Sequence, residues 1–161
     1  MAYYTKILAP GEEVRYAGRL HWAIYVRAWL ALLVAVAAAL DYFYLRPSSE
    51  QMADNMGSAI PGVIAAFFLI GGILLFLSAW VRRVTTEIVV TDRRIIFKEG
   101  LIQRRTMEMN MSKVETVDVV QSIWGRLFNY GNILIRGTGS TYEPLRLVAS
   151  PVALRTAIIA R

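Results

Sequence analysis

Two long apolar segments near the N-terminus constrain this chain more than any other feature. The first runs from about Ala28 to Leu45 with Asp41 as its one charge, and the second, from about Ile60 to Val81, carries none. A helix needs roughly 20 mostly apolar residues to cross a hydrocarbon core about 30 Å thick, and both segments reach or approach that length. A pair of buried helices in a soluble core is the alternative, but a chain of 161 residues has too little other mass to cover them. The segments therefore predict a helical hairpin that crosses a bilayer twice.

The charges around the hairpin predict its orientation. Lys and Arg close to membrane ends are retained on the cytoplasmic side, whereas acidic residues matter little. Basic residues flank the outer ends of both segments, but the loop at 46–59 contains a single basic residue, Arg46. The flanking residues are Lys6, Arg15, Arg19, Arg27, Arg82 and Arg83. We therefore expect both termini in the cytoplasm, with the first segment retained as an anchor instead of cleaved as a signal peptide.

The hairpin divides the chain into three parts. Residues 1–27 carry a first strand, residues 28–81 form the hairpin with spans at about 28–45 and 60–81, and residues 82–161 form a cytoplasmic domain. Aromatic residues at the ends of the spans fit the belts found at membrane interfaces. They are Trp22, Tyr25, Trp29, Tyr42, Tyr44 and Trp80.

Outside the hairpin the sequence indicates mainly short β-strands. Residues Glu12–Trp22 alternate with period two, and Val84–Val90 is rich in β-branched residues. Five further strands are predicted at 95–99, 101–111, 114–121, 133–138 and 142–148. The strand at 101–111 places Met107, Met109 and Met111 on one face. This stripe predicts a core contact, with an adaptable binding surface as the alternative.

Two short helical features interrupt and end the strand pattern. A helical turn places Trp124 and Phe128 four residues apart, on one side of the turn, and a Gly131-Asn132 turn follows it. Ser150 followed by Pro151 predicts the N-cap and first residue of a terminal helix at 152–161.

The residues that carry chemistry are few. The chain has no cysteine and one histidine, His21, so we expect no metal site, no thiol nucleophile and no cofactor. No Ser/His/acid set can be assembled, and the stretch at 137–140 is typical of a hairpin turn, so we expect no enzyme. The net charge of +6 is scattered over strands and flanks without a recognition helix, which argues against nucleic acid. No small-molecule substrate is indicated.

Two groups of residues are candidates for binding. The first is a basic group for lipid headgroups, with ordinary solvated strand and turn faces as the alternative. It comprises Arg82, Arg83, Arg93, Arg94, Arg104 and Arg105. The second is a small-residue face on the second span, against which another helix can pack closely. It comprises Ala65, Gly71, Gly72 and Ala79.

Several motifs resemble those of a known family. They are LAPGEEV at 8–14, RLHW at 19–22, VTDRRIIFKEGLI at 90–102 and GRLFNYGNI at 125–133. In these stretches the chain resembles the bacterial pleckstrin-homology (PH) membrane proteins, long catalogued as a domain of unknown function. With the count of elements, the resemblance predicts an α+β membrane protein. Its two-helix transmembrane hairpin is inserted between strands one and two of a seven-stranded PH-like β-barrel, which a C-terminal helix caps.

The resemblance implies a bacterial membrane location but no defined biochemical role, and two functional hypotheses remain. We expect a multi-pass protein of the bacterial cytoplasmic (inner) membrane, with the lipid bilayer as one partner. In the first hypothesis it is a non-catalytic interaction module that forms a homo-oligomer or joins a larger membrane complex as an accessory subunit. In the second it senses anionic lipid headgroups at the cytoplasmic face.

Overall fold

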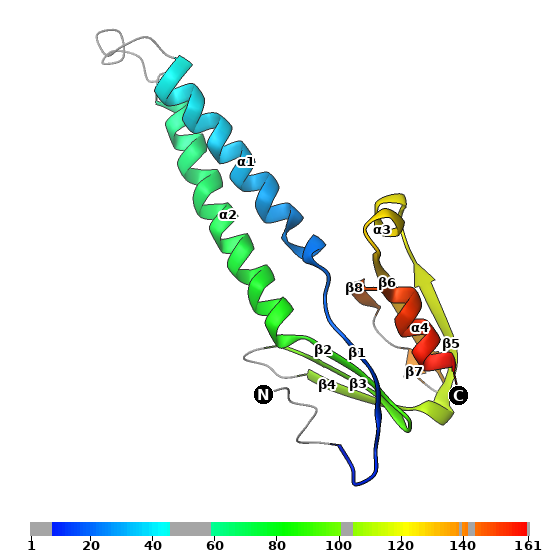
Figure 1. Cartoon of the computed structure of the whole chain (residues 1–161). Helices are drawn as coiled ribbons and strands as arrows, with labels where there is room; N and C mark the ends of the chain where they lie inside the picture. Colours follow the sequence, from blue (N-terminus) through cyan, green and yellow to red (C-terminus); the bar gives the residue numbers. More distant parts are fainter. Residues whose placement is uncertain (1–7, 46–58, 101–104, 139, 142–143, 161) are drawn as a thin grey trace. The chain divides into compact units, whose positions relative to one another are not determined.

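The computed structural model describes residues 8–45, 59–100, 105–138, 140–141 and 144–160 (Figure 1). The chain divides into two compact units. One combines Met1–Ile24 with Val81–Arg161, and the other is Tyr25–Trp80. The fold is α+β, with two long apolar helices and two sheets.

The two long helices follow the apolar segments of the sequence. A 3-10 turn at Trp22–Tyr25 leads into α1 (Val26–Leu40), which continues through a π-helical turn at Asp41–Leu45. Helix α2 covers Ile60–Thr85. Both helical stretches are long and apolar enough to cross a membrane. The second extends past the predicted end at Val81, so the first residues of the strand predicted from Val84 are helical instead.

Helices α1 and α2 pack antiparallel within their unit. Tyr25 stacks on Phe76 with ring centroids 5.0 Å apart, and the side chain of Leu32 lies directly over Gly72. Further along, the ring of Tyr42 covers Gly62. Residues later in α1 thus contact residues earlier in α2, which is the geometry of an antiparallel hairpin.

Eight strands form two antiparallel sheets among the residues that the structure describes. The first sheet has the order β1 (Val14–Gly18), β2 (Glu87–Thr91), β3 (Arg94–Glu99), β4 (Arg105–Asn110). In the second, β5 (Val114–Val120) pairs with β6 (Tyr130–Gly137), and β6 also pairs with β7 (Ser140–Thr141) and β8 (Leu145–Ala149). Helix α3 (Ile123–Leu127) lies between β5 and β6, and α4 (Pro151–Ile159) follows β8.

The prediction of seven strands in a single barrel is wrong. Period-two alternation indicates which face a residue occupies, and it does not say which strand is the neighbour. The predicted strand Glu12–Trp22 therefore divides: Val14–Gly18 pairs with β2, whereas Leu20 bridges to Val148 of the second sheet. The two sheets are also connected by a short 3-10 turn at Met111–Lys113.

The core of this unit lies between the two sheets and α4. Both sheets and α4 contribute its buried members: Ile88, Val90, Ile95, Met109, Val117, Ile133, Ile135, Leu145, Val148, Leu154 and Ile158. Met109 is buried in it and Met111 packs against it, so the core interpretation of the methionine stripe is confirmed for these two residues. Leu154 and Ile158 lie four residues apart on α4, as expected for one buried helix face.

Two local predictions need correction. Pro151 does begin α4, but Ser150 adopts a left-handed conformation with φ 48°, so its side chain makes no cap. Its Oγ instead accepts a hydrogen bond from the Asn129 side chain at 3.1 Å. The predicted turn at Gly131-Asn132 is part of strand β6, and the chain turns two residues earlier, at Asn129, which has φ 57°.

Candidate interaction surfaces

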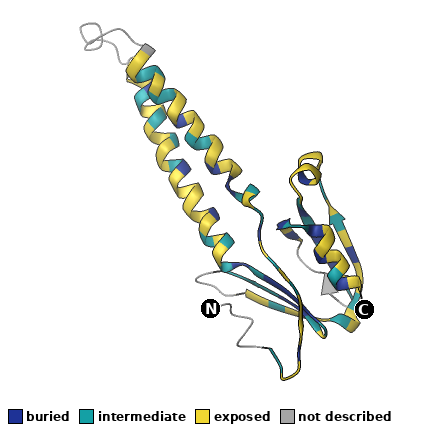
Figure 2. Cartoon of the chain, in the orientation of Figure 1, coloured by how far each residue is buried: buried dark blue, intermediate teal, exposed yellow. Residues whose placement is uncertain are grey.

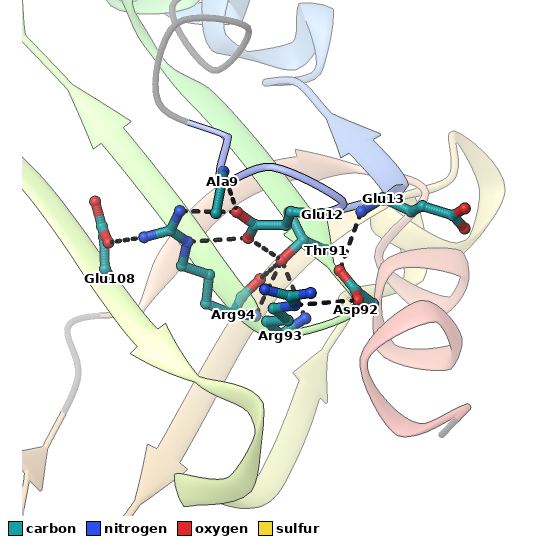
Figure 3. A network of polar contacts seen from close by, with 8 residues as sticks. All are labelled: Ala9, Glu12, Glu13, Thr91, Asp92, Arg93, Arg94 and Glu108. Atoms are coloured by element: carbon teal, nitrogen blue, oxygen red, sulfur yellow. Dashed lines mark hydrogen bonds and ion pairs between the residues drawn. The ribbon is translucent and has the colours of Figure 1, made fainter.

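A polar network joins the N-terminal segment to the turn between β2 and β3 (Figure 3). A tight turn with Gly11 at φ 77° places Glu12 so that its Oε2 accepts a hydrogen bond from the backbone N–H of Ala9 at 2.8 Å. The Glu12 side chain is 0 % exposed. Thr91 donates from Oγ1 to Glu12 Oε1 at 2.8 Å. The carboxylate is therefore dehydrated and held by donors on both oxygens.

Arg94 completes the network with a bidentate ion pair. Its Nε donates to Glu12 Oε1 at 2.9 Å, and its Nη2 donates to Glu12 Oε2 at 2.8 Å. Its Nη1 donates to Glu108 Oε2 at 2.9 Å, so one guanidinium links the N-terminal segment, β3 and β4. We call Glu12, Thr91, Arg94 and Glu108 the clasp.

The electrostatics of the clasp suit a structural role. The hydrogen-bonded Arg94 guanidinium lowers the pKa of the Glu12 carboxyl from 4.5 to about 2, against the opposing effect of burial. Glu12 is therefore ionised throughout the physiological range and is not suited to exchange protons with a substrate. Sequence reasoning missed Glu12, because its partner lies 82 residues away.

The predicted basic group is dispersed in the structure. Arg94 belongs to the clasp, and Arg93 lies beside Asp92 with an N–O distance of 3.6 Å. Arg82 and Arg83 lie in the last turn of α2, and Arg105 begins β4. Arg104 lies outside the described residues. Strand register places Arg105 opposite Glu99, at the end of the first sheet that α2 enters. Arg93 and Arg94 lie at the other end, at the turn between β2 and β3, where an acidic side chain accompanies each of them.

The predicted small-residue face is used largely within the hairpin. A Cβ added at Gly72 would lie 2.8 Å from Leu32 Cδ2 and 3.3 Å from the Leu32 backbone nitrogen, so a larger residue there would require Leu32 to shift. Ala79 is buried on the same helix, seven residues further on. Ala65 is half-buried, whereas Gly71 points into open space. The close helix neighbour of Gly72 is therefore α1 of the same chain.

His21 is held in an aromatic setting. Its ring stacks on Tyr130 at 5.0 Å and lies 5.1 Å from Trp22, and its Nδ1 accepts a hydrogen bond from the backbone N–H of Ala23 at 3.2 Å. Burial, together with the charge of Arg83, lowers the pKa of His21, which favours the neutral imidazole. Within the described ranges, no group of three His, Cys, Asp or Glu side chains can hold a metal ion.

Comparison with models of protein families gives a match. A family model described as "Bacterial PH domain" covers residues 15–161, from the first strand through both apolar helices to the C-terminus. No curated protein matches the chain significantly. The resemblance inferred from the sequence motifs is thus confirmed.

Proposed function

The chain belongs to the bacterial PH domain family, and from this premise we propose that it is a membrane-anchored interaction module that self-associates or joins a larger membrane complex. PH-like domains are generally non-catalytic, which is consistent with a binding role. In this proposal the hairpin anchors the protein in the inner membrane with both termini cytoplasmic, and the PH-like domain makes the protein contacts.

The surface of the hairpin supports the anchor. The core helix of a soluble protein buries most of its apolar side chains, whereas the outward sides of α1 and α2 are exposed (Figure 2). The most exposed of these side chains include Leu30, Leu33, Val36, Phe43, Val63, Phe67, Ile70 and Leu74. Water is a poor solvent for such a surface, and lipid chains are a good one.

The open edge of strand β4 is the observation that carries the assembly proposal. Within the described residues, β4 pairs with β3 on one side and ends the first sheet on the other. An exposed edge offers unpaired backbone donors and acceptors, to which a strand from another chain can add. Strand β5 ends the second sheet in the same way. Headgroup sensing is less well supported, because Arg93 and Arg94 face acidic partners.

The orientation of the hairpin gives a first test. With Ser49→Cys, an impermeant thiol reagent is expected to label the chain in intact cells, because the loop at 46–59 is predicted to face outward. Ser112→Cys should be labelled only after the cells are opened. The chain has no native cysteine, so each label reports a single site. The reverse pattern would overturn the orientation.

The size of the particle tests the assembly. In mild detergent we expect at least a dimer both at low salt and at about 1 M salt, where the Debye length falls to about 3 Å. Backbone pairing and apolar packing are much less sensitive to salt than headgroup attraction. The mass is measured by light scattering coupled to size-exclusion chromatography, with detergent subtracted.

A charge variant separates assembly from lipid sensing. Changing Arg93, Arg104 and Arg105 together to Gln is expected to leave the particle mass unchanged, while weakening any binding to anionic vesicles. Arg94 is kept, because it holds the clasp. A monomer that selects one anionic lipid over others of equal charge would contradict the assembly proposal and favour the headgroup sensor.

A further inference from the structure

A cluster of large apolar side chains projects from the loop between β5 and β6. Ile123, Trp124 and Leu127 of α3 are 85 %, 64 % and 69 % exposed, and the neighbouring Phe128 is exposed as well. The Trp124 and Phe128 rings stack with centroids 6.2 Å apart. We call these four residues the α3 tip. Water-exposed clusters of this kind mark sites of contact with a protein or a membrane.

Hydrogen bonds from side chains hold the backbone beneath the α3 tip in place. Ser122 Oγ accepts a hydrogen bond from Gly125 N–H at 3.0 Å, which caps the turn. Gln121 Nε2 donates to the carbonyl oxygens of Gly125 and Tyr130 at 3.2 and 3.0 Å. A Cβ added at Gly125 would lie 2.6 Å from the Tyr130 oxygen, so the turn needs glycine there. The loop thus presents apolar side chains outward and satisfies these polar groups internally, as a segment entering lipid must.

The α3 tip is tied to the residue at which the first apolar helix begins. Phe128 meets Trp22 edge to face, with centroids 5.6 Å apart, and both belong to the same compact unit. Trp22 is also the first residue of the helical stretch Trp22–Tyr44, which is long enough to span a membrane. If that stretch crosses the bilayer, Trp22 lies at the interface, where tryptophan is enriched, and it holds the tip there.

The charges around the α3 tip match an anionic surface. The sequence has no acidic residue between Asp118 and Glu143, and Arg126 lies exposed in the last turn of α3. A basic residue beside Trp, Phe, Ile and Leu is the pattern of segments that lie in the interface and bind anionic lipid. A protein partner would not require this continuity with the start of the first span.

We propose that the α3 tip inserts into the cytoplasmic interface of the bilayer and forms a second membrane contact, which fixes the PH-like domain against the lipid surface. The inference rests on the proposed function, since it requires the hairpin to be in the membrane. Its depth is that of an interfacial segment, about 5–10 Å into the boundary between headgroups and acyl chains.

Spin labels on the full chain test this contact. Leu127→Cys, Leu74→Cys and Ser112→Cys are each labelled and reconstituted into nanodiscs of phosphatidylcholine and phosphatidylglycerol. Collision with oxygen reports lipid, and collision with a water-soluble nickel chelate reports water. We expect lipid exposure at Leu74 on α2, interfacial depth at Leu127 and water at Ser112. Strand β5, at about 3.3 Å per residue, separates Ser112 from the tip.

The three labels separate the two proposals. Nickel access at Leu74 would overturn the membrane anchor itself. Lipid exposure at Leu74 combined with nickel access at Leu127, or with shielding of Leu127 from both reagents by protein, would overturn the inference alone. With Ile123→Asn and Trp124→Asn added, the Leu127 label is expected to move toward water. Both side chains are exposed, so an unchanged circular dichroism spectrum should accompany that shift.

Discussion

Replacing residues 25–80 by a short flexible linker is expected to leave a folded, water-soluble domain, whereas removing residues 8–22 as well is expected to abolish folding. The expectation follows from the division of the chain, in which the N-terminal residues belong to the same compact unit as the sheets. The hairpin is an insertion into this unit and supplies none of its strands.

The N-terminal segment is hydrogen-bonded to both sheets. Residues Val14–Gly18 pair with β2 of the first sheet. A few residues later, His21 N–H donates to Leu147 O at 2.7 Å, and Ala149 N–H donates to Arg19 O at 3.1 Å. Its removal exposes an edge of β2, leaves β8 paired with β6 alone, and leaves Arg94 without Glu12. We expect the lost backbone pairing and the unpaired Arg94 to destabilise the domain enough to prevent folding, because small domains are only marginally stable and open strand edges promote aggregation.

Circular dichroism and amide NMR spectra measure the outcome. The variant that keeps residues 8–22 should show a cooperative thermal transition and dispersed amide resonances, while the shorter variant should aggregate or show neither. Removing residues 1–7 alone is the control, because Ala9 and Glu12 remain. Equal melting of the long and the short variant would show that the segment is not a part of the domain.

The elements set by local properties are the ones that sequence reasoning found. Length and hydrophobicity act within a segment, so both helices of the hairpin were foreseeable. Their ends were less so: Val84 and Thr85 are β-branched, but they continue α2 because β-propensity is weak against an established helix. The crossing of a membrane and its direction stay predictions.

The features that depend on distant partners were not foreseeable. No residue near Glu12 in the sequence indicates that it pairs with Arg94, and the sequence predicts Arg94 in a basic group for lipid headgroups instead. In the same way, the small-residue spacing identified Gly72 as a packing site but not α1 as the neighbour. The spacing of Trp124 and Phe128 places them on one side of a turn, but it does not indicate whether that side faces the core or the solvent. In the structure both side chains are exposed.

Glu12→Gln is expected to lower the free energy of unfolding by about 2 kcal/mol at neutral pH. The Gln amide is neutral and its NH2 group cannot accept a hydrogen bond, so the charge pair and one of the two hydrogen bonds from Arg94 are lost. The Glu12 side chain is dehydrated, and Arg94, at 23 % exposure, recovers only part of its hydration. For a domain of this size the melting temperature should fall by about 10 °C. The measurement is thermal unfolding of the full chain in mild detergent, followed by circular dichroism.

The pH dependence of this difference identifies the clasp as its cause. The pKa of Glu12 is about 2 in the folded chain, below the ordinary 4.5, so the unfolded chain binds the proton more readily. The stabilisation is therefore complete above about pH 5 and is lost as the pH falls from 4.5 toward 2. The difference in melting temperature between wild type and Glu12→Gln should be largest at neutral pH and should decrease as the pH falls from 4.5 toward 2. Glu13→Gln, which removes the same charge from the exposed neighbouring side chain, is the matched control and should follow the wild type. A gap that stays constant down to pH 2 would mean that Glu12 stabilises the fold through packing, not through its charge.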